Sequence, residues 1–244
     1  MEVESQAITV CVPASIQNDK QLNFVQFLIA NFNLQTKENK ELVISDDSRS
    51  GELRALCEMA RLQGIKVRYF ESSIKGIAAN LNNAIRCAIT PFIKIMFQDD
   101  FFFRNDVLEH VVNELESSDC LWYVSACNHY NELTGECYEA FFPRKSNRLL
   151  LGNNSISSPS VVSFKREAFE PFSERLTYLV DCEWYLRMSH KHGLPIFGNR
   201  IEVSNRIHDS QATHWAKAYL ESEIVLSKMM HSSTKMGQRA CLCL

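Results

Sequence analysis

The sequence predicts an α/β fold in which a mostly parallel central sheet is flanked by helices. Short apolar runs of β-type alternate with helical patterns of about a dozen residues through the first half of the chain, and this alternation favours right-handed βαβ units. The composition, with 45% hydrophobic and 23% charged residues in 244, is ordinary for a globular enzyme. The second half is less regular, and no Pro/Gly-rich linker separates it from the first.

Each element of the first half follows from its hydrophobic spacing. The run ITVCV is nearly continuous in apolar residues and predicts a buried strand, and the next segment has apolar residues at helical spacing. The same alternation repeats three more times. The expected strands are residues 8–12, 41–45, 66–70 and 92–97, and the expected helices are residues 22–34, 52–63, 76–88 and 107–115.

The second half gives weaker signals. A strand-like segment and a following one are separated by the turn-like sequence NELTG, which is typical of a hairpin. A polar loop at residues 149–160 then leads to a short strand and two helical patterns. The expected strands are residues 121–126, 138–142 and 161–164, and the expected helices are residues 179–192 and 213–231.

Charge and terminal sequences narrow the classes of function. The formal net charge is -3 and no long basic block occurs, so we expect no nucleic-acid partner. The opening MEVESQ lacks the basic and apolar regions of a signal peptide, and no run approaches the ~18 apolar residues of a membrane span. We therefore expect a cytoplasmic protein.

The nine cysteines include no C-x-x-C pair, so neither a zinc ribbon nor a thioredoxin motif is predicted. Several lie in apolar runs, where free cysteine packs as a small hydrophobe, and this favours a reducing compartment. The last four residues, CLCL, formally match a C-a-a-X prenylation box. No polybasic segment accompanies them, and we expect an unmodified tail.

Acidic residues follow two of the predicted strands. Asp46 and Asp47 come after the second strand, and Gln98, Asp99 and Asp100 come after the fourth. Ligands of parallel sheets bind outside the carboxyl ends of the strands, so these groups should line one crevice. Since no G-x-G-x-x-G or P-loop occurs, a carboxylate-held Mn²⁺ or Mg²⁺ is the remaining simple way to bind a diphosphate there. The alternative is that the first acidic pair forms only a turn and helix cap.

The ordered set of these segments resembles the family 2 glycosyltransferases of the GT-A fold. The resemblance runs from about residue 8 to residue 208, through ITVCVPAS, the Gln35-Thr36 pair, ELVISDDSRS, the helix start at Lys75-Gly76, and FIKIMFQDD. Each piece is short, but their order is specific. The resemblance implies a nucleotide-sugar-binding half at about residues 1–127, an acceptor half at about 128–212, and a C-terminal helix and tail at 213–244, in one domain.

In the first half the resemblance assigns a role to each acidic group. Asp46 and Asp47 would contact the base and ribose of the donor, Asp99 would lie near the ribose and diphosphate, and Asp100 would be the principal metal ligand. Gln98 stands where many members carry the first Asp of the DXD motif, which is a departure. The matching turn and helix start place four more residues at the nucleotide: Pro13, Ser15, Gly76 and Asn80.

In the second half, VDCEW resembles the family's E-D-W-E-L helix start, which implies that Asp181 is the general base. Val180 replaces the family's Glu, and Glu183 is the second candidate for the base. Glu183 has an alternative role, because Arg187 lies four residues later on the same helix and can pair with it at the helix surface.

The late R-x-H pattern implies that Arg206 faces the diphosphate and His208 completes the metal site, although a lone His is more often structural. Asn153 lies in a loop expected near the acceptor, for which a plain surface loop is an equal alternative. Trp184 is a candidate for stacking on a sugar, but burial in the core is expected for at least two of the three tryptophans, Trp122, Trp184 and Trp215.

The resemblance implies an inverting glycosyltransferase that moves a sugar from a nucleotide-diphosphate sugar to an acceptor hydroxyl. A saccharide or lipid-linked saccharide acceptor and a role in bacterial surface polysaccharide synthesis are expected, with peripheral contact at the inner face of the membrane as an option. Two alternatives are a non-catalytic GT-A-like protein that binds nucleotide-sugars or carbohydrates, and a nucleotidyltransferase. The Gly-rich basic first loop typical of the latter is not found in PASIQNDK.

Overall fold

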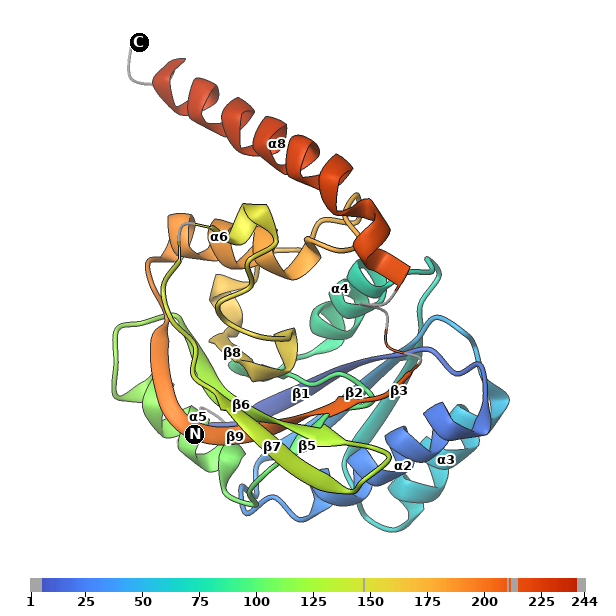
Figure 1. Ribbon diagram of the computed structural model, residues 1–244. Helices are drawn as coiled ribbons and strands as arrows, with labels where there is room; N and C mark the ends of the chain where they lie inside the picture. The colour runs from blue at the N-terminus through green and yellow to red at the C-terminus, as the bar shows by residue number, and fades with distance from the viewer. Residues whose placement is uncertain (1–5, 147, 210, 212–214, 241–244) are drawn as a thin grey trace.

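The computed structural model describes residues 6–146, 148–209, 211 and 215–240, with side chains described up to residue 230. Its centre is a nine-stranded sheet with the order β3-β2-β1-β4-β8-β6-β9-β5, and β7 pairs with β6 beside this path. Helices lie on both sides of the sheet, with α2, α3 and α5 on one side and α4 and α6 on the other (Figure 1). The predicted α/β sheet with flanking helices is confirmed.

The N-terminal half contains the four strands and four helices predicted from the sequence. Strands β3, β2, β1 and β4 are parallel to their neighbours, so their carboxyl ends lie along one edge. The first strand is buried along nearly its whole length, as its continuous apolar run predicts. The strands are β1 (Ile8–Ala14), β2 (Lys40–Asp46), β3 (Val67–Glu71) and β4 (Phe92–Ile95), and the helices are α2 (Asp19–Asn33), α3 (Gly51–Leu62), α4 (Ile77–Cys87) and α5 (Val107–Glu116).

The second half turns the sheet into a mixed one. Strand β8 (Val162–Lys165) is antiparallel to β4, and β6 (Trp122–Asn131) is antiparallel to β8. Strand β9 (Ile196–Ile207) then runs parallel to β6, and β5 (Phe101–Phe102) is antiparallel to β9. The expected parallel pairing therefore holds among the first four strands and between β6 and β9, and the other pairings of the sheet are antiparallel. The predicted hairpin is present, with β7 (Glu136–Phe141) antiparallel to β6.

The longest strand, β9, was not predicted from the sequence. A half-buried strand is recognised by alternating apolar and polar residues, but in β9 the buried run includes the polar residues Glu202, Ser204 and Arg206. Two short helices, η1 (Leu149–Leu151) and η2 (Pro159–Val161), interrupt the predicted polar loop. Helix α6 (Val180–His192) follows, as predicted.

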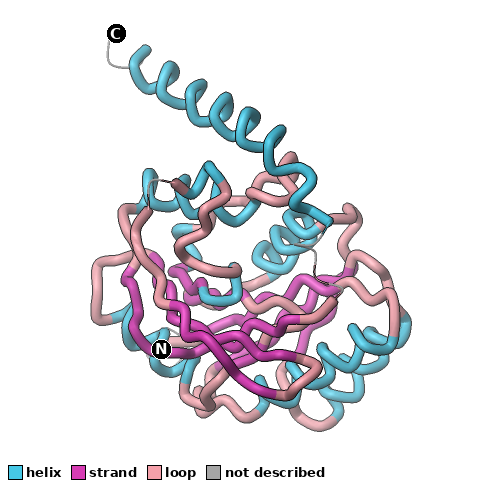
Figure 2. The backbone as a smooth tube through the Cα atoms, in the orientation of Figure 1, coloured by secondary structure: helices cyan, strands magenta, loops and turns pink. Residues whose placement is uncertain are grey.

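The predicted C-terminal helix is present, and residues 215–216, the first described residues of its predicted range, are already helical. A short turn of helix, η4 (Lys217–Tyr219), leads into α8 (Leu220–Ala240), whose later turns project away from the body (Figures 1 and 2). The first residues of the predicted helix and the CLCL tail lie outside the described residues. Among the described residues no helix is both long enough and apolar enough to span a membrane.

Candidate active site

The turn after β2 is organised around the carboxylate of Asp46. This side chain is fully buried and accepts hydrogen bonds from the backbone N–H groups of Ser48 (2.8 Å) and Ser50 (2.7 Å) and from the hydroxyl of Tyr69 (2.9 Å). Charge-assisted bonds of this kind are strong. Asp46 therefore shapes the turn, and both of its oxygens are already engaged within the protein.

Asp47 follows Asp46 directly in the same turn. Its Oδ2 accepts the backbone N–H of Gly76 at 2.9 Å, and Gly76 has φ +120°, a conformation that requires glycine. One turn into the helix that follows, Asn80 donates from Nδ2 to the carbonyl of Ala14 at 2.8 Å, and its buried Oδ1 has no hydrogen-bond partner among the described residues. The ends of β1 and β2 and the start of α4 thus meet at one place.

Gln98 joins the end of β4 to the end of β1. Its Oε1 accepts the backbone N–H of Ser15 at 2.8 Å, and its Nε2 donates to the Ser15 carbonyl at 3.3 Å. A carboxylate could accept the first of these bonds but could not donate the second. The Gln at this position therefore has a structural function of its own. Pro13 lies two residues earlier in β1 and is partly buried.

The next two acidic residues contact the end of β9. Asp99 Oδ2 lies 2.9 Å from Nε2 of His208. The carboxylate of Asp100 is only 5% exposed, and it accepts the backbone N–H of Arg206 (3.0 Å) and contacts the hydroxyl of Ser158 (3.3 Å). Burial, and next the adjacent charge of Asp99, raise the pKa of Asp100 above its ordinary value.

The side chain of Arg206 is bonded to the backbone of the turn that contains Asp99 and Asp100. Its Nε donates to the carbonyl of Asp99 at 2.8 Å, and its guanidinium forms an ion pair with Glu132. The guanidinium is enclosed by four aromatic rings whose centroids lie 4.6–5.3 Å away, an arrangement that favours a cation. It is therefore embedded in protein, in contrast to the expected position facing a diphosphate. The four rings belong to Phe24, Phe27, Phe101 and Tyr130.

The site residues fit a divalent cation that is bound together with a phosphate. Among the described residues no group of three or more His, Cys, Asp or Glu side chains is arranged as a complete metal centre. Asp99, Asp100 and His208 nevertheless bring carboxylate oxygens and an imidazole to one turn, and this donor set suits Mn²⁺. Proteins commonly hold Mg²⁺ with one or two carboxylates and complete its coordination with substrate phosphates and water.

Asp181 lies in the first turn of α6. Its Oδ1 accepts the backbone N–H of Cys182 at 2.7 Å, and its Oδ2 accepts Nδ2 of Asn154 at 2.7 Å. Burial raises the pKa of Asp181 to about 6, against the opposing effect of these hydrogen bonds. The carboxylate is therefore ionised at neutral pH and is a stronger base than an ordinary Asp. Asn153, the expected loop residue, is exposed, and its neighbour Asn154 makes the contact.

A continuous polar network joins the candidate base to Asp100. Asn154 Oδ1 accepts the N–H of Ser157, whose hydroxyl bonds to Nδ2 of Asn205 at 2.9 Å. The hydroxyl of Ser158 lies 3.1 Å from Asn205 Oδ1 and 3.3 Å from Asp100 Oδ2, and it shares its single proton between these two acceptors. Ser157 has φ +93°, a strained conformation of the kind that clusters at functional sites. The sequence indicated only that this loop is polar.

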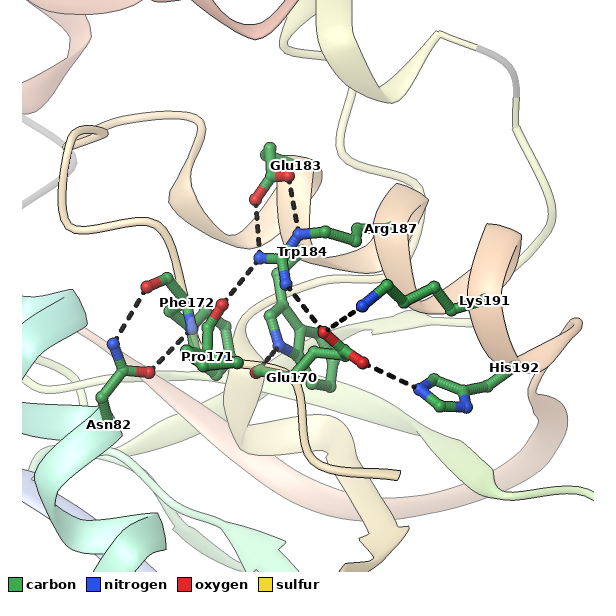
Figure 3. Close-up of polar contacts among 9 residues, drawn as sticks. All are labelled: Asn82, Glu170, Pro171, Phe172, Glu183, Trp184, Arg187, Lys191 and His192. Atoms are coloured by element: carbon green, nitrogen blue, oxygen red, sulfur yellow. Dashed lines mark hydrogen bonds and ion pairs between the residues drawn. The ribbon is translucent and has the colours of Figure 1, made fainter. Parts of the chain in front are cut away.

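Glu183, the second candidate for the base, is held in a structural network (Figure 3). It is 1% exposed, and its two oxygens accept Nε and Nη2 of Arg187 at 2.9 and 3.0 Å. Arg187 also donates to the carbonyl of Pro171 at 2.7 Å. The alternative pairing with Arg187 is thus confirmed, although the pair lies inside the protein rather than at the helix surface.

Trp184 belongs to the core. It is fully buried, its Nε1 donates to the carbonyl of Glu170 at 2.6 Å, and its ring stacks on Phe172 with centroids 4.6 Å apart (Figure 3). Trp122 is also fully buried, whereas Trp215 is 56% exposed. The expected burial of at least two tryptophans is confirmed, and Trp184 is not placed to stack on a sugar.

Comparisons with known proteins agree with this geometry. The model of the family "Glycosyl transferase family 2" matches residues 9–172. An uncharacterized glycosyltransferase of Rickettsia conorii is 27% identical over 128 residues, which cover 51% of this chain and 20% of the relative. An uncharacterized glycosyltransferase of Rickettsia felis is 26% identical over 112 residues, which cover 46% of this chain and 18% of that relative. The matched part of the chain thus spans about a fifth of the length of these relatives.

Solved structures show the same mixed, curled sheet with flanking helices. The mannosyltransferase PcManGT from Pyrobaculum calidifontis, in complex with GDP-Man and Mn²⁺, has a TM-score of 0.68 at 14% identity, covering 91% of this chain and 64% of that one. S. aureus TarS 1-349 in complex with UDP-GlcNAc has a TM-score of 0.65 at 13% identity. The match covers 85% of this chain and 60% of the TarS chain. The fold is that of GT-A glycosyltransferases, and since the family model matches more than half of the chain, the chain belongs to glycosyl transferase family 2.

Proposed function

We propose that the chain is an inverting glycosyltransferase that moves a sugar from a nucleotide-diphosphate sugar to an acceptor hydroxyl. One observation carries the proposal. Asp181, an ionised carboxylate with a raised pKa, and Asp100, an acid at the end of β4, are linked by a single hydrogen-bonded network. A single displacement at an anomeric carbon needs a base for the acceptor hydroxyl and a group that offsets the charge of the departing diphosphate, and Asp100 would supply the second by holding a cation.

The donor half supplies the nucleotide contacts. Asp47 accepts the N–H of Gly76 with one carboxylate oxygen. The buried Oδ1 of Asn80 is an acceptor that a polar ligand could bond to. Asp100, with Asp99 and His208, would hold Mn²⁺ or Mg²⁺. When bound, such a cation offsets the negative charge that develops on a diphosphate leaving group. PcManGT, a protein of the same fold, was solved with GDP-Man and Mn²⁺.

Asp181 would take the proton of the acceptor hydroxyl onto its carboxylate. The acceptor oxygen then attacks the anomeric carbon on the face opposite the diphosphate, and the carbon–oxygen bond to the diphosphate breaks. An α-linked donor would thus give a β-linked product. Asn154 orients the base by its bond to Oδ2, and the N–H of Cys182 fixes the other oxygen.

We further propose a saccharide or lipid-linked saccharide as the acceptor, in bacterial surface polysaccharide synthesis. The bacterial origin of the Rickettsia glycosyltransferases supports this setting. A cytoplasmic location with peripheral contact at the inner face of the membrane fits such an acceptor. Membership in a glycosyltransferase family argues against the nucleotidyltransferase alternative. A non-catalytic GT-A-like binding protein is the remaining one, and Val180 in place of the family's Glu is the residue that favours it.

The first test is thermal unfolding of the chain with UDP, GDP, dTDP or CMP, each with and without MnCl₂. A ligand at 100 times its dissociation constant adds about 2.7 kcal/mol to the free energy of unfolding. We expect one nucleotide to stabilise the protein only when Mn²⁺ is present. Stabilisation by none of them would contradict donor binding. Donor binding without turnover of the matching nucleotide-sugar would favour the non-catalytic alternative.

A further inference from the structure

The first two turns of α8 pack against the segment that leads into α6, the helix that contains the candidate base Asp181. Glu223 in this helix is only 4% exposed. Its Oε1 accepts the backbone N–H of Thr177 at 2.6 Å, and its Oε2 accepts the N–H groups of Tyr178 (2.9 Å) and Leu179 (2.8 Å). Three backbone donors on one buried carboxylate make a strong, charge-assisted contact between segments more than forty residues apart.

These three donors belong to the segment that leads directly into α6. Leu179 is the N-cap residue of that helix, and its side chain makes no capping hydrogen bond. The Leu179 carbonyl accepts the first intrahelical bond, from the N–H of Glu183 at 2.9 Å. A carboxylate near a helix N-terminus is also favoured by the helix dipole. Glu223 thus accepts the N–H of the N-cap residue, as the Glu of a capping box does, and it also fixes the two residues before it.

The candidate base lies two residues after Leu179, in the first turn of α6. Its second support, the loop containing Asn154, also touches α8. Gly152 in that loop has φ +78°, and a Cβ at this position would lie 2.8 Å from Cδ1 of Leu220. The start of α8 therefore contacts both elements that orient the base, the entry to α6 and the loop that donates to the Asp181 carboxylate.

We propose that Glu223 is a positioning residue for glycosyl transfer, acting through the N-terminus of α6 on Asp181. The inference rests on the proposed function, since it takes Asp181 as the base. It extends the catalytic unit into a helix whose sequence gives no sign of a role in catalysis. A displacement of the base by about 1 Å is enough to lower a rate about 100-fold.

The test compares Glu223→Gln with the matched control Glu221→Gln, an exposed acid in the same helix. Each variant is assayed for release of UDP from UDP-GlcNAc and of GDP from GDP-mannose, with Mn²⁺ and with water as the acceptor. Glu223→Gln is expected to lower kcat by about 10- to 100-fold, with the donor KM unchanged. Glu221→Gln is expected to behave as the wild type. Wild-type kcat in folded Glu223→Gln would overturn the proposal.

A second comparison separates this inference from the assignment of the base. In an Asp181→Asn background, Glu223→Gln should cause no further loss of the residual rate, because both changes act on the same step. A further loss by the same factor as in the wild type would overturn the proposal. If Asp181→Asn alone keeps the wild-type rate, it is the assignment of the base that fails.

Amide hydrogen exchange tests the contact without any substrate. Residues 177–179 should exchange at least about tenfold faster in Glu223→Gln than in Glu221→Gln, because their acceptor has been removed. Unchanged protection would overturn the proposal. If Glu223→Gln does not fold, Glu223→Asp, which keeps a carboxylate on a shorter side chain, is put through the same rate and exchange comparisons, with the same expected direction.

Discussion

The two halves of the molecule hold their functional carboxylates in different ways. In the N-terminal half, Asp46 is held chiefly by its own turn, through backbone N–H groups two and four residues further along. In the C-terminal half, the carboxylate of Asp181 accepts a hydrogen bond from Asn154, 27 residues earlier, and the entry to its helix is bonded to Glu223, more than 40 residues later. Asp46 is thus held mainly by local backbone geometry, with one added contact from Tyr69. Asp181 combines one local bond, from the N–H of Cys182, with support from distant parts of the chain.

This difference separates the consequences of substitution. Substitution of Asp46 in the turn after β2 should lower the free energy of unfolding, because its carboxylate accepts the backbone N–H groups of that turn. Changes around Asp181 should affect transfer more than stability, because the network there is partly strained and carries a carboxylate with a raised pKa.

Asp181→Asn should lower kcat by about 10³-fold and leave the dissociation constant of the donor unchanged. The amide keeps the shape of the side chain but cannot accept the proton of the acceptor. The measurement is turnover of the matching nucleotide-sugar together with calorimetric titration of its nucleotide. Full transfer in this variant would remove Asp181 as the base.

Asp46→Asn should lower the free energy of unfolding by about 3 kcal/mol. An amide nitrogen would replace one acceptor oxygen and face backbone N–H donors in a fully buried place. Urea unfolding measures the loss, and Asp47→Asn, which disturbs a single hydrogen bond, is the matched control, with an expected loss of about 1 kcal/mol. Equal losses in the two variants would contradict the structural assignment of Asp46.

Glu183→Gln should lower the free energy of unfolding by about 2 kcal/mol, because Arg187 then keeps only Glu170 of its two ion-pair partners, in a largely buried setting. The kcat per folded molecule should not change. Unfolding curves and turnover under the same conditions give both quantities. A loss of turnover with wild-type stability would instead identify Glu183 as the base.

The rate should fall about tenfold for each pH unit below the pKa of Asp181, which burial raises to about 6. Stability should respond in the opposite direction. A carboxyl with a raised pKa stabilises the folded state fully below its unfolded pKa of about 4, and this contribution is lost as the pH rises through about 6. The pH dependence of kcat/KM tests the predicted fall in rate, and the pH dependence of the free energy of unfolding tests the predicted change in stability. A rate that stays constant down to about pH 5 would contradict a base with this pKa.

Asp100→Asn should raise the free energy of unfolding without metal by about 1 kcal/mol at neutral pH. The pKa of Asp100 is raised by burial and by the charge of Asp99, so the ionised form costs stability that the neutral amide does not. Urea unfolding in EDTA measures the change. A large destabilisation would show that the Asp100 carboxylate supports the fold, as Asp46 does.

The sequence predicted the parts of the structure that local patterns determine. The four parallel strands and their helices were visible as alternating apolar runs, and the acidic pairs after β2 and β4 were visible as strand ends. Strand β9 was not, because Glu202 and Arg206 are buried in it for reasons that only the neighbouring strands and helices supply. Its apolar alternation is therefore lost.

The site shows the same limit. The sequence indicated Asp100 and Asp181 but not what joins them, since Asn154 and Asn205 meet only after the sheet has formed. It also placed Arg206 at the diphosphate, whereas four aromatic rings from α2, β5 and β6 enclose its guanidinium. Such an enclosure has no local sequence signal, because its members are scattered from Phe24 to Tyr130.

The most direct test of the account is a titration of Mn²⁺ followed by electron paramagnetic resonance, in the presence of the nucleoside diphosphate that stabilises the chain. The wild type and Asp181→Asn should each bind about one Mn²⁺ per chain when the nucleotide is present, and Asp100→Asn should bind none under the same conditions. This result would place the metal and diphosphate in the donor half, independently of the base. Equal Mn²⁺ binding by Asp100→Asn and the wild type would show that the acids after β4 do not hold the cation through which the donor's diphosphate would bind.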